Sequence, residues 1–130
     1  LMGKNCKYSG VSNDNAKVHD FLQGKEYIMF CPEMLGNLPV PRQPVEIIEN
    51  RAINSAGQDK TQEFSQGAAL SLQLCEKYQP ELIILKESSP SCGVHKIYDG
   101  TFSHTTVKGS GFTASLLKKM GYTVISEEDL

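Results

Sequence analysis

Residues 61–85 read TQEFSQGAALSLQLCEKYQPELIIL, and this stretch decides the fold. Apolar residues recur in it at spacings of three and four positions, which predicts an amphipathic helix that runs to about Tyr78 and that Pro80 ends. Residues 82–85 then follow as four consecutive apolar side chains, which predicts a strand buried on both faces. A long helix that leads into such a strand is typical of an α/β domain.

The sequence on either side supplies the other predicted elements. They are a helix over about 15–23, a buried strand over 27–30, a hairpin of 45–48 with 51–54, a helix over about 112–120 and a strand over 122–125. The opening Leu1-Met2-Gly3 has the character of a turn that follows a strand, so we expect a first strand ahead of Leu1. The pattern predicts one small three-layer α/β domain over residues 1–130, with a mostly parallel sheet of about four strands.

Composition narrows the possible partners. The chain has 130 residues, a net charge of -2 and 22% charged residues, which fits one folded domain and disfavours disorder. It shows no basic stripe of the kind that nucleic-acid binding proteins carry, and no apolar run long enough to cross a membrane. We also find no signal segment and expect a cytoplasmic protein. The sequence says nothing of the oligomeric state.

The four cysteines fall into two groups. Cys75 lies on the apolar face of the helix predicted in 61–85, so we expect it in the core. Cys6, Cys31 and Cys92 lie in turn-rich segments, and the last two follow predicted strands. Because the carboxyl ends of parallel strands meet at one edge, three thiols there would suit a metal or an iron-sulfur cluster. Three unrelated buried thiols explain the spacing equally well.

Polar residues and glycines at the same edge are candidates for handling a substrate. Glu33, two positions beyond a cysteine, could act as a general acid or base, or could be a solvated loop residue. Ser89 and Ser91 could donate hydrogen bonds to a substrate oxygen or cap a turn. Gly109 and Gly111 precede the last helix and could form a cradle for a polar ligand, or an ordinary helix start.

Several motifs, in order and across essentially the whole chain, resemble those of a known family. They are Leu1-Met2-Gly3-x-x-Cys6-Lys7-Tyr8-Ser9-Gly10, Cys31-Pro32-Glu33 with Gly36-x-Leu38-Pro39-x-Pro41-Arg42, 85–93 with Tyr98-Asp99-Gly100-Thr101-Phe102, Gly109-x-Gly111-x-Thr113-Ala114 and the ending Val124-Ile125-Ser126-Glu127-Glu128. The chain is similar to a small bacterial family, long catalogued as domain of unknown function 523 (DUF523), that contains the thiouracil desulfidases.

The resemblance implies a cofactor and its ligands. The characterised desulfidases of the family hold a 4Fe-4S cluster on three cysteines and leave one iron free to accept sulfur from the substrate. Cys31 and Cys92 match two of these ligands by motif. The third family ligand stands directly before the Leu-x-Gly motif, ahead of Leu1, and Cys6 is a candidate substitute.

The resemblance also implies an activity. Glu33 and Ser89 match the family positions assigned to proton transfer and substrate handling, and Ser91, Gly109 and Gly111 are our candidates for further substrate contacts. The expected reaction removes sulfur from a small thiolated base such as 2-thiouracil, giving uracil and sulfide. Two alternatives stay open: a non-catalytic metal or iron-sulfur module that Cys6 completes, and a metal-free protein that binds a small ligand.

Overall fold

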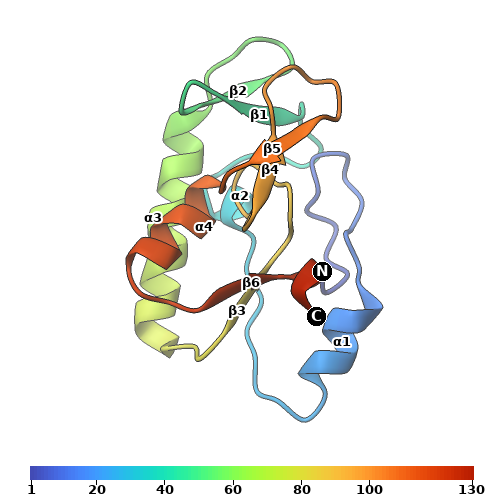
Figure 1. Ribbon diagram of the computed structural model, residues 1–130, viewed down its shortest axis with the longest axis vertical. Helices are drawn as coiled ribbons and strands as arrows, with labels where there is room; N and C mark the ends of the chain where they lie inside the picture. The colour runs from blue at the N-terminus through green and yellow to red at the C-terminus, as the bar shows by residue number, and fades with distance from the viewer.

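A long helix, a shorter helix and a short parallel sheet form the framework of the molecule around one cluster of buried side chains. The computed structural model describes residues 1–130. Helix α3 (Thr61–Tyr78) runs along one side of the molecule, and strand β3 (Ile83–Leu85) follows it (Figure 1). Strand β3 pairs in parallel with β6 (Val124–Ser126), and α4 (Phe112–Lys119) leads into β6. The predicted α/β class is therefore confirmed, and these elements lie close to their predicted positions.

The strands form three two-stranded sheets, of which only β3–β6 is parallel, in place of the single, mostly parallel sheet of about four strands that the sequence predicted. The other elements are α1 (Ala16–Leu22), α2 (Pro32–Leu35), the antiparallel pair β1 (Val45–Ile48) and β2 (Arg51–Asn54), the antiparallel pair β4 (Lys96–Tyr98) and β5 (Thr106–Lys108), and the 3-10 turn η1 (Glu127–Asp129). The predicted hairpin is confirmed as β1–β2. The β4–β5 pair lies in a segment for which the sequence predicted only a loop.

The strand predicted over 27–30 is wrong. This segment forms no strand, and Tyr27, Ile28 and Met29 are 51%, 46% and 58% exposed. A run of apolar residues becomes a buried strand only where a neighbouring strand takes its backbone hydrogen bonds, and no strand pairs with this segment. Phe30 alone turns inward and packs against the core.

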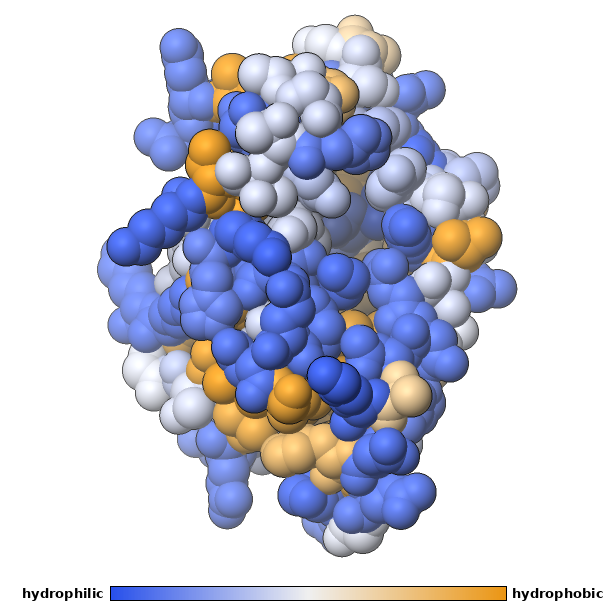
Figure 2. All heavy atoms as spheres, turned by 45° about the vertical axis from the view of Figure 1, so that its right-hand side comes forward, coloured by the Kyte–Doolittle hydropathy of each residue, from blue (hydrophilic) through white to orange (hydrophobic).

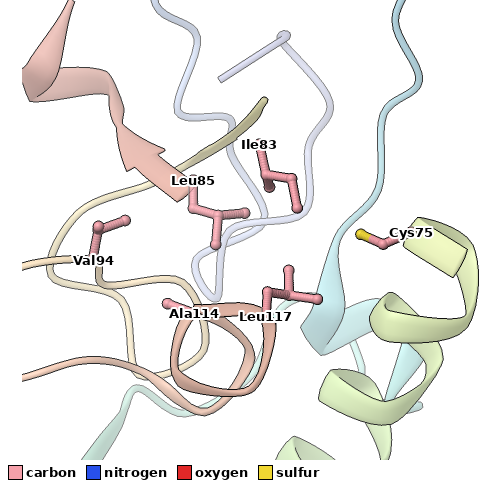
Figure 3. Close-up of a cluster of buried hydrophobic side chains, with 6 residues drawn as sticks. All are labelled: Cys75, Ile83, Leu85, Val94, Ala114 and Leu117. Carbon is pink, nitrogen blue, oxygen red and sulfur yellow. The ribbon is translucent and has the colours of Figure 1, made fainter. Parts of the chain in front are cut away.

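Two clusters of buried side chains hold the elements together. The first joins Cys75 of α3, the two apolar ends of β3, and α4, as Figure 3 shows; its members are Cys75, Ile83, Leu85, Val94, Ala114 and Leu117. The second lies between α3 and the β1–β2 pair and contains Leu38, Val45, Ala52 and Phe64. Phe64 also meets Phe112 at the start of α4, with ring centroids 5.8 Å apart. The expected core position of Cys75 is confirmed.

The surface is largely polar. On the face in Figure 2, hydrophilic residues cover most of the area, and hydrophobic ones gather mainly in a band across the lower part. None of the helices combines the length and apolar composition that crossing a bilayer requires.

Two glycines let α2 touch the backbone of α3. A Cβ atom on Gly36 would lie 2.1 Å from the carbonyl oxygen of Glu63, and one on Gly67 would lie 2.1 Å from that of Pro32. Both distances are far shorter than any real carbon–oxygen contact, so neither position accepts a side chain in this packing. The contact matters for the site because α2 begins directly after Cys31 and carries Glu33.

We expect Gly67→Ala to destabilise the protein. Alanine has the higher helix propensity, by about 1 kcal/mol, but the clash with Pro32 outweighs that gain and should lower the free energy of unfolding by roughly 1–3 kcal/mol. Urea unfolding followed by circular dichroism measures the change. Ser65→Ala, at an exposed position of the same helix, is the matched control and should be neutral or slightly stabilising. A Gly67→Ala protein as stable as the wild type would contradict the close contact.

Candidate active site

The carboxylate of Glu33 is the centre of the candidate site. Glu33 lies in the first turn of α2, and its side chain is only 14% exposed. Its Oε1 accepts hydrogen bonds from Arg42 Nη2 at 2.7 Å and Nε at 3.2 Å. Its Oε2 accepts one from Ser91 Oγ at 2.7 Å and a longer one from Ser89 Oγ at 3.4 Å. The two oxygens therefore face different partners, a guanidinium on one side and hydroxyls on the other.

The two serines are held by their own loop. Ser89 Oγ accepts hydrogen bonds from the backbone N–H of Ser91 at 3.2 Å and of Cys92 at 3.1 Å. The two hydroxyl oxygens are 3.0 Å apart. Because Ser89 Oγ already accepts two N–H groups, its own proton is available for donation toward Ser91 or Glu33. The structure thus brings Glu33, Ser89 and Ser91 together, and Ser91 makes the shorter contact with the carboxylate.

The two candidate glycines lie behind the serine loop. The backbone N–H groups of Phe112 and Thr113 donate to Pro90 O at 2.9 Å and Ser91 O at 2.8 Å. A Cβ on Gly111 would lie 2.5 Å from the carbonyl carbon of Ser91, so this glycine permits the close approach. The N–H of Gly109 donates to His95 O at 3.1 Å. The first-turn donors of α4 thus bind the protein's own loop, and a contact between these glycines and substrate stays a prediction.

Three cysteines lie near Glu33 in the folded chain. Cys31 directly precedes α2, Cys92 directly follows Ser91, and both are partly buried. Ser91 Oγ lies 3.5 Å from Cys92 Sγ. Cys6 is tied to the same place because its carbonyl oxygen accepts a hydrogen bond from Arg42 Nη2 at 3.2 Å. The structure thereby gathers cysteines that are 25 and 61 positions apart in the sequence.

Burial keeps the thiols of Cys31 and Cys92 protonated in the metal-free chain. The pKa of Cys31 is raised to about 11, mainly by burial, and the nearby Cys6 thiol and the charge of Glu33 contribute to this rise. Burial likewise raises the pKa of Cys92 to about 12, with additional contributions from the charges of Glu33 and Cys31. Because thiolates bind metals and thiols do not, loading a metal here must release protons.

The donor set fits an iron-sulfur cluster better than a single ion. No three His, Cys, Asp or Glu side chains converge closely enough to hold one metal ion. Each cysteine of an iron-sulfur cluster binds a different iron, so its ligands need not converge on one point. Cysteine thiolates are the ligands that such clusters take. Cys31, Cys92 and Cys6 are the residues that would hold one.

Arg42 is the site residue that sequence reasoning missed. Its side chain is 6% exposed and forms an ion pair with Glu33. The proline-rich sequence around Arg42 did not predict this contact. The one available signal was a lone arginine within an otherwise uncharged stretch over 34–45. Arg42 also borders a hollow of about 460 Å³, whose lining includes none of the three thiols.

Slow alkylation should reveal the raised pKa values. In the metal-free chain at pH 8, Cys31 should carry about 100-fold less thiolate than a thiol at the ordinary pKa of 9.0, and Cys92 about 1000-fold less, so both should react correspondingly slowly with iodoacetamide. Peptide mapping by mass spectrometry measures each rate against glutathione. The rate at Cys31 should rise as the pH approaches about 11. A rate at either cysteine equal to that of glutathione would show that the thiols are not buried in this way.

Known proteins resemble this chain in both sequence and fold. A family model described as 2-thiouracil desulfurase matches residues 1–129. The uncharacterized protein YbbK of Bacillus subtilis (strain 168) is 40% identical over 140 residues, which cover 100% of this chain and 93% of that protein. The solved structure of the [4Fe-4S]-dependent thiouracil desulfidase TudS superposes with a TM-score of 0.92 at 39% identity, covering 100% of this chain and 87% of that one. The chain belongs to the 2-thiouracil desulfurase family.

Proposed function

We propose that this chain is an iron-sulfur-dependent desulfidase that converts a thiolated pyrimidine such as 2-thiouracil into uracil and sulfide. The reaction replaces C=S by C=O: water supplies the oxygen, sulfur leaves as sulfide, and no net oxidation takes place. The observation that carries the proposal is the buried carboxylate of Glu33, which accepts hydrogen bonds from a serine pair and lies near the thiols of Cys31 and Cys92. Family membership and the likeness to TudS support it.

The cofactor and the protein contribute different parts of the chemistry. A 4Fe-4S cluster held by Cys31, Cys92 and Cys6 would supply an iron with an open coordination position, a Lewis acid with affinity for sulfur. Glu33 is the general base: its Oε2 accepts a proton from the water that attacks the thiocarbonyl carbon. Oε1 is less suited to this role, because it accepts two hydrogen bonds from the positively charged guanidinium of Arg42, which disfavours protonation of that oxygen.

Ser89 and Ser91 are the residues that orient the base. Their hydroxyls are rigidly placed, since backbone N–H groups fix Ser89 Oγ and the carboxylate fixes Ser91 Oγ. Once Oε2 of Glu33 has taken a proton, it no longer needs to accept a hydrogen bond from Ser91. The Ser91 hydroxyl can then turn toward the oxygen or sulfur of the substrate. The same hydroxyls offer a short route by which the proton leaves Oε2.

Sulfide release tests the proposal. Protein reconstituted with iron and sulfide without oxygen should release sulfide from 2-thiouracil and form uracil, which liquid chromatography detects. Glu33→Gln should keep its iron content and lower kcat by about 10²- to 10⁴-fold, because an amide cannot accept the proton. Glu76→Gln, an exposed position on α3, is the control and should retain full turnover.

Two results would count against the proposal. Normal turnover by iron-loaded Glu33→Gln would remove the assigned base. Iron-loaded wild-type protein that consumes neither 2-thiouracil nor other thiolated pyrimidines would favour a non-catalytic iron-sulfur module instead.

A further inference from the structure

Arg42 uses four of the five N–H groups of its guanidinium within the protein. Besides the two hydrogen bonds to Glu33, Nη1 donates to the carbonyl oxygen of Pro39 at 3.0 Å and Nη2 to that of Cys6 at 3.2 Å. Its backbone N–H also donates to the carbonyl oxygen of Tyr8, at 2.6 Å. With a side chain that is 6% exposed, Arg42 is neither a surface charge nor free to bind a ligand.

These contacts decide which oxygen of Glu33 faces the serine pair. Nε and Nη2 both donate to Oε1, so two charge-assisted hydrogen bonds hold this oxygen against the guanidinium. Oε2 is left to Ser91 and Ser89. Without Arg42, the carboxylate would rotate about its last side-chain bond, since α2 is a single turn and gives no other contact to Oε1.

The same guanidinium joins two thiol-bearing segments. Nη2 lies between Glu33 Oε1 and the carbonyl of Cys6, so one nitrogen connects the Cys6 loop to the helix that follows Cys31. A lysine could neutralise the carboxylate but, having one nitrogen, could not also hold the Cys6 and Pro39 carbonyls in this geometry.

We propose that Arg42 is a positioning residue of the desulfidase reaction: it holds Glu33 Oε1 so that Oε2 faces the serine pair. This inference rests on the proposed function for its kinetic consequence, but its structural content stands apart from that function. Arg42 acts through Glu33 and touches no reacting atom.

The kinetic test compares Arg42→Lys with the wild type. In iron-loaded protein, Arg42→Lys should lower kcat about 10- to 100-fold, with KM and iron content nearly unchanged, because the base is misoriented while binding is intact. In a Glu33→Gln background the same change should have almost no effect. Arg51→Lys, at an exposed arginine 2.7 Å from Asp59, is the matched control and should leave kcat unchanged. Additive losses in the double variant would overturn the proposal, because Arg42 would then act independently of Glu33.

A structure of the metal-free variant gives a readout that needs no activity. In a crystal structure of Arg42→Lys, Glu33 Oε2 should have left hydrogen-bond distance of Ser91 Oγ while α2 keeps its place against α3. If that variant does not fold, Arg42→Gln serves, since its amide can still donate one hydrogen bond. A carboxylate that stays on Ser91 in the variant would overturn the proposal. Inactive wild-type protein with a displaced Glu33 in the variant would refute the desulfidase function and leave the positioning role intact.

Discussion

The side chain of Glu33 accepts hydrogen bonds from Arg42 on one oxygen and from Ser91 on the other, at a place where its carboxylate is largely shielded from water. Each partner comes from a different loop, so this one buried ion fixes how the loops of the site lie relative to one another. Removing one member of a buried pair costs about 3–5 kcal/mol, because the other charge stays behind uncompensated. The site therefore depends on Glu33 both for its shape and for its chemistry.

The position of Glu33 follows from the contact between two helices. Helix α2 has four residues and could not hold its place alone, since isolated helices of that length are unstable in water. The absence of side chains at Gly36 and Gly67 lets it lie directly on α3, the longest element of the fold. The long helix α3 thus supports the short helix α2, and α2 places Cys31 and Glu33 next to the serine loop.

The parts predicted correctly from sequence are those that local pattern determines. The periodicity of 61–78 and the turn between 48 and 51 are local, and both elements form as expected. The 27–30 segment failed because an apolar run does not reveal whether a partner strand exists. The β4–β5 pair escaped notice because each strand has only three residues, too few for alternation to be diagnostic, and none of these residues is fully buried.

The candidate site divides in the same way. The rule that strand-end loops meet at one edge led to the expectation that Cys31, Cys92 and Glu33 lie together. The structure does bring them together, although no strand precedes Cys31, so the rule applies only to the loop that follows β3 and carries Cys92. Arg42 could not be placed, because its role comes from contacts with Cys6 and Glu33 that only the folded chain creates. Likewise, no sequence pattern reveals that the backbone N–H groups in the first turn of α4 donate hydrogen bonds to the carbonyl oxygens of the serine loop.

The number of irons that the chain binds is the most decisive measurement for the proposed cluster. After reconstitution without oxygen, we expect about four irons and four sulfides per chain, with absorption at roughly 400 nm. Cys31→Ser and Cys92→Ser should lose this cluster, whereas Cys75→Ser, which changes a core thiol of α3 outside the proposed ligand set, should keep it. A wild-type chain that binds no iron, or a Cys31→Ser chain that binds as much as the wild type, would contradict the account.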